Sequence, residues 1–226
     1  PFLLRMTTWV SGTPVSDLGA TDRGFRIQLG GIAAEMIDCL SPLNDAPGDD
    51  HSHHWMVETA GSSLRSTMGS VTDPHRRSLI DRALAWFDEA APRIPELPRS
   101  VVHQDLHDFN MLAERDNAGH PHITGIVDFN DAVSTVRIAE LAVAAAYSGL
   151  RQPDAYVAFC EVVEGYLARA TLSDTEIDAL YRLAVARLAV NASTWTQRAS
   201  GANAEYAESR MAATWPPLER LLNVAP

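Results

Sequence analysis

Residues 101–112, "VVHQDLHDFNML", carry most of the information about the fold of this chain. Two short apolar runs, of the kind that form strands, stand on either side of a polar turn that contains His103, Asp105 and Asn110. A further short apolar run, "HITGIVDFND", follows and contains Asp128. The pattern predicts small strands and hairpins at the centre of the chain, with the densest polar chemistry in the turns between them.

Helical patterns surround this centre. Apolar residues recur at helical spacing over residues 22–41, 73–94, 136–150, 154–170, 173–199 and 203–223. Asp22 and Asp73 are expected N-caps. Ser173 and Glu176 form an expected capping box, and Asp154 is expected to cap the preceding helix. The predicted fold class is therefore α+β and mostly helical, with a small β insert.

The region between the first two helices, residues 42–74, is rich in Pro, Gly, Ser and Thr and reads as a long connecting loop with about one turn of helix. Its histidines His51, His53 and His54 invite a zinc interpretation. Their spacing lacks a framework of cysteines or paired helical histidines, so we favour a loop that binds no metal. Trp55 beside them is either a core residue or part of a substrate pocket.

The composition narrows the class of protein. A net charge of −11 with interspersed acidic residues argues against a nucleic-acid surface and suits a small cationic substrate. No apolar run is long enough to span a membrane and no signal peptide opens the sequence, so we expect a cytoplasmic protein without a membrane partner. Cys39 and Cys160 are expected to be buried free thiols. The sequence contains no lysine, so any step that needs one depends on residues outside it.

The offset between Asp105 and Asn110 suits phosphoryl transfer. An aspartate on a turn between strands can accept the proton of an attacking hydroxyl group. Asn110 and Asp128 can supply oxygen ligands to Mg²⁺, a cation that binds few carboxylates together with phosphate oxygens. Catalysis of this reaction is mostly positioning and charge neutralisation, and kinases combine such an Asp and Asn with a second, metal-binding Asp. These residues predict a base beside a magnesium site.

The same residues resemble the aminoglycoside phosphotransferase and choline kinase superfamily, small-molecule kinases of protein-kinase-like fold. The run "GIVDFNDAVSTVRIAELAVAAAYSGL" is most similar to the hydroxylysine kinase branch, as is "HHWMVETA", with Met56 where an acidic residue is usual. The resemblance implies that Asp105 is the catalytic base and that Asn110 and Asp128 bind Mg²⁺. It also implies that His103 orients the loop.

The resemblance covers nearly the whole chain, but only as the C-terminal lobe of that fold. In the superfamily a lysine in an N-terminal β lobe holds the nucleotide phosphates, and this sequence has neither. Residues 1–12 then correspond to the end of that lobe and the hinge, where the backbone of Thr8 and Val10 would contact the adenine. Residues 13–226 correspond to the C-terminal lobe. We therefore expect a longer polypeptide, which leaves room for further fused domains.

Several polar residues near the predicted site are candidates for substrate binding. Asp131 follows the metal strand directly and suits a cationic group, while His107 and Asp108 are either substrate ligands or solvated loop residues. Glu140 is expected to be a surface carboxylate near a helix start. Asn130 stands where the superfamily usually has glycine, and because Asn tolerates left-handed backbone angles, the turn can survive.

The sequence therefore predicts a Mg²⁺-dependent phosphotransferase that moves the γ-phosphate of ATP or GTP to a hydroxyl of a small amine-bearing molecule. A hydroxylated amino acid is the first expected substrate, and an aminoglycoside or another amino alcohol comes next. One alternative is a non-catalytic, kinase-like module that binds a small ligand for a larger fused protein, which the missing lysine lobe favours. Another is a metal-dependent hydrolase, for which the Asp-to-Asn offset and the hinge-like opening would be coincidences.

Overall fold

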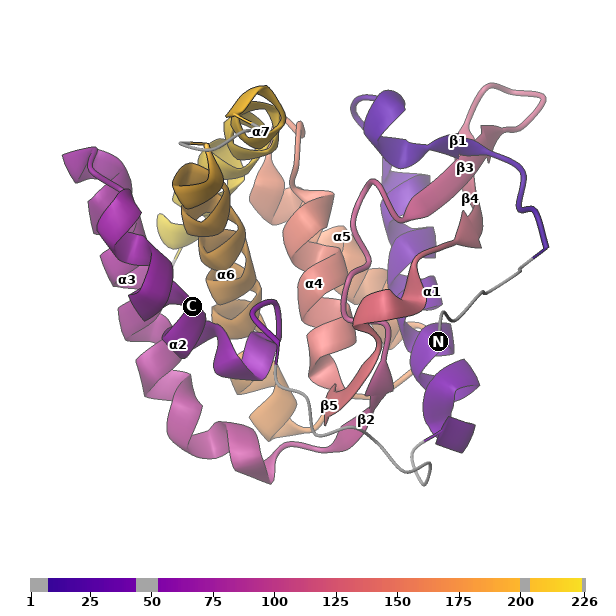
Figure 1. Cartoon of the computed structure of the whole chain (residues 1–226). Helices are drawn as coiled ribbons and strands as arrows, with labels where there is room; N and C mark the ends of the chain where they lie inside the picture. Colours follow the sequence, from indigo (N-terminus) through magenta and orange to yellow (C-terminus); the bar gives the residue numbers. More distant parts are fainter. Residues whose placement is uncertain (1–7, 44–52, 200–203, 225–226) are drawn as a thin grey trace, which may run out of the picture.

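Helices dominate the computed structural model, which describes residues 8–43, 53–199 and 204–224. The helices are α1 (Arg23–Leu40), α2 (Ala60–Thr67), α3 (Pro74–Ala90), α4 (Ile138–Ser148), α5 (Ala155–Leu167), α6 (Asp174–Arg198) and α7 (Ala204–Leu222). The strands are β1 (Thr13–Pro14), β2 (Arg99–Val102), β3 (Met111–Arg115), β4 (Pro121–Ile126) and β5 (Val133–Val136). Figure 1 shows the helices side by side, with β1, β3 and β4 at the right of the view and β2 and β5 at the bottom.

The strands form two small antiparallel sheets. One has the order β1-β3-β4, and the other pairs β2 with β5, with Arg99 opposite Val136. The three-stranded sheet lies beside α1 in Figure 1, and the two-stranded sheet lies near one end of α4. Gln28 of α1 holds β4 in place, because its Oε1 accepts a hydrogen bond from the backbone nitrogen of Ile123 at 2.9 Å. The expected β insert is therefore present and docks on the helices.

Helix α4 forms the centre of the core. Every residue from Ile138 to Ser148 is buried, and the helix packs against α1, α5 and α6. Its residues are apolar on nearly every side, with Glu140 as the one charged member, and such a helix belongs in the interior of a protein. Helix α6 is also buried continuously from Leu183 to Thr194, a run that includes the charged residue Arg187. Both helices contact the polar turn between β2 and β3, through Glu140 of α4 and Arg187 of α6.

Helices α1 and α5 pack with their backbones in close contact. A Cβ atom on Gly30 would lie only 1.9 Å from the carbonyl oxygen of Val162. A Cβ atom on Gly165 would lie 2.0 Å from the carbonyl oxygen of Ile27. The glycine that interrupts the helical pattern of α1 is therefore explained by the close approach of α5.

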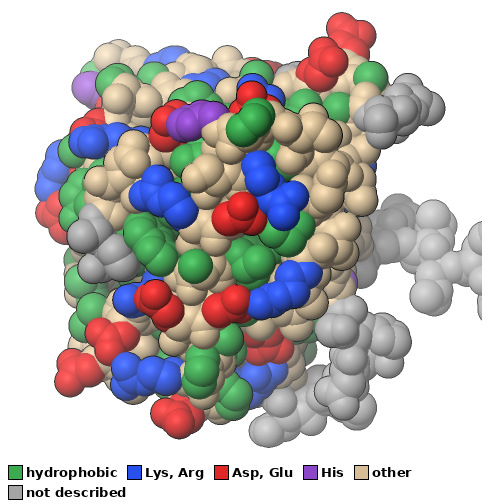
Figure 2. Space-filling model, turned by 90° about the vertical axis from the view of Figure 1, so that its left-hand side faces the viewer, with side chains coloured by type: hydrophobic (Ala, Val, Ile, Leu, Met, Phe, Trp, Pro, Cys, Tyr) green, Lys and Arg blue, Asp and Glu red, His purple; other side chains and the backbone are tan. Residues whose placement is uncertain are grey.

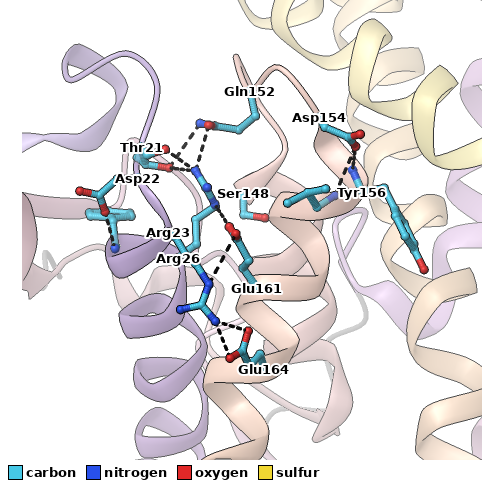
Figure 3. A network of polar contacts seen from close by, with 12 residues as sticks. Thr21, Asp22, Arg23, Arg26, Ser148, Gln152, Asp154, Tyr156, Glu161 and Glu164 are labelled. Carbon is cyan, nitrogen blue, oxygen red and sulfur yellow. Dashed lines mark hydrogen bonds and ion pairs between the residues drawn. The ribbon is translucent and has the colours of Figure 1, made fainter.

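Ion pairs tie the edge of this helix pair together, as Figure 3 shows. Arg23 Nη2 lies 2.6 Å from Glu164 Oε1, and Arg26 Nε lies 2.5 Å from Glu161 Oε2. Arg26 also donates a hydrogen bond to Gln152 at 3.1 Å. These contacts fix the position of α5 along α1.

Capping residues begin four of the helices. Asp22, Asp73 and Ser173 accept hydrogen bonds from backbone N–H groups in the first turns of α1, α3 and α6, which confirms the expected caps. Glu176 completes the capping box. The expectation for Asp154 is wrong, because its carboxylate accepts from backbone N–H groups of the following helix, α5. A side-chain acceptor satisfies free N–H groups, which exist only at the start of a helix.

Residues 42–74 contain more helix than expected. In the described part of this region, α2 is flanked by short 3₁₀ turns. Its sequence, "AGSSLRST", has little intrinsic helix preference, but it packs against α6, where Thr67 Oγ1 lies 2.7 Å from Ser193 Oγ. Tertiary packing therefore stabilises a helix that local propensity does not indicate.

Two further features differ from the expectations. Strand β5 was not expected, and its pairing with β2 brings together segments more than thirty residues apart. Cys39 and Cys160 are free, as expected, but both are exposed and not buried. Each lies on the solvent side of its helix, a placement that the apolar neighbours along the sequence conceal.

The surface near α3 carries charges of both signs. Figure 2 turns this side of the molecule to the viewer and shows basic and acidic side chains interspersed. Exposed ion pairs of α2 and α3 include Arg65 with Asp88 and Arg77 with Asp81. None of the helices in the described ranges combines the length and apolar character needed to cross a membrane.

Candidate active site

The polar turn of the sequence joins the two sheets. Residues 103–110, here called the central loop, leave β2 at Val102 and enter β3 at Met111. The backbone nitrogen of Val127, which follows β4, donates to the carbonyl oxygen of Asn110 at 3.0 Å. This bond holds the end of the central loop beside the turn that carries Asp128.

The carboxylate of Asp105 is held from three sides. Its Oδ1 lies 2.7 Å from Nη2 of Arg187, an α6 residue that is only 2% exposed. Its Oδ2 lies 2.9 Å from Nδ2 of Asn110 and 3.1 Å from Nε2 of His107. The orientation of the carboxylate is therefore fixed by its protein partners.

These partners also fix the charge of Asp105. Burial alone would raise its pKa, but the hydrogen bond from His107 and the positive charge of Arg187 outweigh burial and lower the pKa well below its usual range. The carboxylate is consequently ionised at neutral pH. It can accept a hydrogen bond from a hydroxyl group of a bound molecule.

His103 connects the central loop to the segment after β4. Its ring is fully buried, with Nε2 3.1 Å from the carbonyl oxygen of Val127. Its Nδ1 accepts a hydrogen bond from the backbone nitrogen of Asp105 at 3.2 Å, and its ring packs edge-on against Phe129. Burial lowers the pKa of His103, so the ring is neutral near pH 7. The residue contacts the backbone of Asp105 and lies beneath the loop.

Glu140 lies in the interior, which corrects the expectation of a surface carboxylate. It belongs to the first turn of α4 and is fully buried, and its Oε2 accepts from the backbone nitrogen of Gln104 at 3.2 Å. Gln104 has a positive φ of 69°, so the central loop turns sharply over this carboxylate. Burial raises the pKa of Glu140 to about 7. The sequence shows that Glu140 lies near the start of a helix, but it does not show that the central loop covers the first turn of that helix.

Asn110 and Asp128 supply oxygen atoms to the cavity that Asp105 also lines. The side-chain nitrogen of Asn110 donates to Asp105, so its side-chain oxygen is available to another partner. Asp128 uses Oδ1 to accept from Nδ2 of Asn130 at 2.7 Å, and Oδ2 has no hydrogen bond to the described residues. In the described ranges no group of three or more His, Cys, Asp or Glu side chains could hold a metal alone. Two hard oxygen ligands fit Mg²⁺, which completes its shell with phosphate oxygens and water.

The residue at the glycine position of the turn does not need a left-handed backbone. Asp128 itself adopts the left-handed conformation, with φ 64°, and Asn130 lies in the 3₁₀ turn Phe129–Asp131. Asn130 contributes its side chain by donating to Asp128. The substitution is therefore accommodated through the side chain and not through the backbone tolerance expected from the sequence.

A cavity of about 260 Å³ opens above Asp105. Its lining consists of Trp55, Asp105, His107, Phe109, Asn110, Asp128, Asp131, Tyr147, Arg187, Asn191, Trp195, Arg198 and Tyr206. The structure thus brings together most of the residues singled out in the sequence, including the alternative placement of Trp55 in a pocket.

Four predicted site residues lie outside this lining, and one of them is the buried His103 already described. Asp108 is buried, forms an ion pair with Arg151 and does not line the cavity. Thr8 is exposed, and Val10 packs against Gly125 of β4. A turn position alone could not show that Asp108 has an arginine partner forty-three residues further along the chain.

Sequence reasoning missed the contribution of α6 to the cavity. Arg187, Asn191, Trp195 and Arg198 come from one stretch of this helix and line the cavity. Arg187 interrupts the apolar run "LAVARLAVNA". A charge inside such a run needs a buried partner, which was the available signal.

The histidines near Trp55 have partners of their own. His53 Nδ1 accepts from the backbone nitrogen of Trp55 at 3.3 Å, and His54 Nε2 lies 2.7 Å from Thr194 Oγ1. His51 lies outside the described residues. The two described histidines therefore tie this loop to itself and to α6.

Comparison with known proteins extends the similarity beyond the site. A hydroxylysine kinase of Danio rerio is 30% identical over 189 residues, which cover 82% of this chain and 53% of that protein. A hydroxylysine kinase of Xenopus laevis is 25% identical over 190 residues, which cover 80% of this chain and 50% of that protein. The chain spans about half the length of these curated relatives.

Solved structures and family models agree with this similarity. A microcompartment-associated aminopropanol kinase has a TM-score of 0.64 at 19% identity, over 92% of this chain and 65% of that one. This likeness confirms the expected fold class, a mostly helical α+β chain of kinase-like fold. The model of the phosphotransferase enzyme family matches residues 1–181. Because this match covers most of the sequence, the chain belongs to the phosphotransferase enzyme family.

Proposed function

We propose that this chain is the substrate-binding part of a Mg²⁺-dependent kinase that transfers the γ-phosphate of ATP or GTP to a hydroxyl of a small amine-bearing molecule. The observation that carries the proposal is the ionised carboxylate of Asp105, held beside Asn110 and Asp128 in one cavity. In this proposal residues 13–226 are the C-terminal lobe, and residues 1–12 are the hinge and the end of an N-terminal lobe.

Asp105 is the proposed catalytic base. Its carboxylate would accept a hydrogen bond from the substrate hydroxyl and take the proton as the hydroxyl oxygen bonds to the γ-phosphorus. The bond from that phosphorus to the oxygen of the β-phosphate breaks in the same transfer, and the nucleoside diphosphate leaves. Arg187, Asn110 and His107 hold the carboxylate in place and keep it ionised. His103 would position the base, because its ring nitrogen Nδ1 accepts a hydrogen bond from the backbone nitrogen of Asp105.

Asn110 and Asp128 are the proposed ligands of Mg²⁺. The cation would neutralise the phosphate oxygens of the nucleotide during transfer. Asn130 would orient Asp128 through the hydrogen bond to its Oδ1. The backbone of Thr8 and Val10 would contact the adenine or guanine ring, beside the three-stranded sheet.

The amine-bearing substrate class is proposed from the relatives and from the acidic lining of the cavity. The two curated relatives are named for hydroxylysine, and the structural neighbour for aminopropanol, both of which carry an amine and a hydroxyl. Asp131 lines the cavity and would pair with the ammonium group, and His107 would lie next to the reacting hydroxyl. Asp108 remains a weaker candidate, since Arg151 already binds it.

The test is nucleoside diphosphate release by the full-length protein, with Mg²⁺, ATP or GTP, and a panel of hydroxylated amino acids, amino alcohols and aminoglycosides. We expect turnover with one class, and we expect Asp105→Asn to lower kcat by at least about a hundredfold. Asp38→Asn, the same substitution at an exposed position on α1, is the matched control and should leave kcat unchanged.

Folding of the variant is checked separately because Asp105 contacts a buried arginine. Far-UV circular dichroism and thermal stabilisation by Mg²⁺ with ATP should be retained in Asp105→Asn, since asparagine keeps an oxygen that Arg187 can use. Full turnover in a folded Asp105→Asn protein would refute the assigned role. Absence of turnover across the panel, with ligand binding intact, would favour a non-catalytic binding module.

A further inference from the structure

The cavity around Asp105 carries opposite charges on its walls. Asp128 and Asp131 come from the turn that follows β4, whereas Arg187 and Arg198 come from α6. Both arginines lie beyond the residues matched by the family model, which end at 181. The cavity therefore presents an acidic side, shared with the reacting groups, and a basic side that belongs to this chain's own α6.

Both terminal nitrogens of the Arg187 guanidinium bind groups of the protein itself. Its Nη2 binds Asp105, and its Nη1 donates to the carbonyl oxygen of Trp55 at 2.8 Å. Its guanidinium also lies over the rings of Trp55, at 5.0 Å, and Tyr147, at 5.6 Å. Arg187 thus stabilises the base and the cavity wall, and a ligand would have to displace these contacts to reach it.

Arg198 differs from Arg187 in its partners. Its guanidinium lies 4.9 Å from the ring centre of Trp195 and 5.4 Å from that of Trp55. Among the described residues, no carboxylate lies within 4.0 Å of it, whereas Arg23, Arg65 and Arg93 all have one. Two aromatic rings therefore hold an exposed positive charge at the cavity wall without neutralising it.

The positive charges of this wall also act on the neighbouring His54. Burial lowers the pKa of His54, and the charges of Arg198 and Arg187 lower it further. His54 therefore stays neutral near pH 7 and adds no positive charge of its own. The positive charge on the basic side of the cavity therefore comes from the two arginines of α6.

We infer that Arg198 binds the carboxylate of the substrate, so that the acceptor of this kinase is a hydroxylated amino acid and not an amino alcohol or an aminoglycoside. The inference rests on the proposed function. A guanidinium binds a carboxylate through two parallel hydrogen bonds, and its planar face can stay stacked on the tryptophans at the same time.

The same charge would exclude the competing substrates. Amino alcohols and aminoglycosides are cations without a carboxylate, so an arginine that has no carboxylate partner in the described part of the chain disfavours them. A zwitterion matches both sides, with its ammonium group towards Asp131 and its carboxylate towards Arg198. The cavity, at about 260 Å³, is also smaller than the sites that hold drug-sized ligands, which suits a single amino acid.

Calorimetric binding to the full-length protein, without nucleotide and at low salt, tests this inference. The probes are hydroxylysine and homoserine, each compared with its carboxamide, which keeps the amine and the hydroxyl but lacks the negative charge. We expect at least one acid to bind about ten- to a hundredfold more tightly than its carboxamide. Arg198→Gln should remove this difference, and Arg198→Lys should restore part of it.

Arg76→Gln is the matched control. Arg76 also lies over a tryptophan, 5.1 Å from the ring centre of Trp215, but it does not line the cavity. This variant should retain the preference for the acid. Equal binding of acid and carboxamide, equal weakening of both by Arg198→Gln, or binding of neither would overturn the inference.

Turnover measured on the same probes separates this inference from the proposed function. Phosphorylation of the acid and the carboxamide at the same kcat/KM would support the proposed kinase activity and refute the role of Arg198. A binding preference for the acid that depends on Arg198, without any turnover, would support the carboxylate site and refute the proposed kinase activity.

Discussion

A single buried carboxylate, Glu140, couples the stability of this protein to pH. Burial raises its pKa to about 7 from an ordinary value near 4.5, so the folded protein keeps a proton that the unfolded chain has already released. The stabilisation from this proton is fully present below about pH 4.5 and is lost as the pH rises through about 7. At higher pH the carboxylate is charged beneath the central loop, near the charge of Asp105.

Glu140→Gln should remove this pH dependence, because glutamine resembles the neutral acid at every pH. We expect the free energy of unfolding of the unmodified protein to fall, through Glu140, by up to about 3 kcal/mol between pH 5 and pH 8. The fall should be correspondingly smaller in the variant. Urea unfolding across this range measures it, with Glu114→Gln on the exposed end of β3 as control. Identical pH slopes for Glu140→Gln and the unmodified protein would contradict the prediction.

The residues that could be predicted from the sequence are those whose partners are close along the chain. Asp105 and Asn110 share one turn, and the hairpin of β3 and β4 brings Asp128 to the same place. Glu140 and Arg187 could not be placed, because their contacts with the central loop cross 36 and 82 residues. The apolar run around Arg187 signals that this residue is buried, but only the tertiary fold identifies Asp105 as its partner.

Helices and strands, like single residues, could be predicted where local sequence determines them and not where a distant partner does. Helices α1, α3 and α6 have capping residues that satisfy their own first turns, so their starts could be predicted. Helix α2 and strand β5 lack such signals, because α2 depends on packing against α6 and β5 depends on pairing with β2. Neither element can be inferred before the partner element is placed.

The α1–α5 contact offers a test at the scale of elements. Gly30→Ala would place a methyl group within 1.9 Å of a backbone carbonyl of α5, and backbone cannot move aside as a side chain can. We expect a loss of about 3 kcal/mol in the free energy of unfolding. Gly24→Ala is the control, because its Cβ would meet nothing closer than Asp22 Oδ1 at 3.4 Å and should change stability by less than about 0.5 kcal/mol.

Thermal and urea unfolding of both variants decide between packing and helix propensity. Alanine is the better helix former, so propensity alone would make both substitutions stabilising. A Gly30→Ala protein as stable as the unmodified one would show that the two helices are free to move apart.

At the scale of the whole molecule, the described start of the chain is docked on the three-stranded sheet. Val10 packs against β4 so closely that a Cβ atom on Gly125 would lie 2.3 Å from its Cγ1. Thr124 Oγ1 donates to the carbonyl oxygen of Ser11 at 2.9 Å. If this segment is the hinge that contacts the nucleotide, then β4 sets its position relative to the acceptor cavity.

Gly125→Ala in the full-length protein should therefore affect the two substrates unequally. The new methyl group would push Val10 off the sheet and displace the backbone of the hinge, while Asp105 and α6 stay in place. We expect KM for the nucleotide to rise by about tenfold, with KM for the acceptor changed by less than about twofold. Initial-rate kinetics with each substrate varied in turn measure both values. Gly69→Ala, at an exposed position with nothing within 4 Å of the added Cβ, is the control. Equal increases in both KM values would mean that the sheet supports the acceptor cavity as much as the hinge, and an unchanged nucleotide KM would mean that residues 8–12 do not contact the nucleotide.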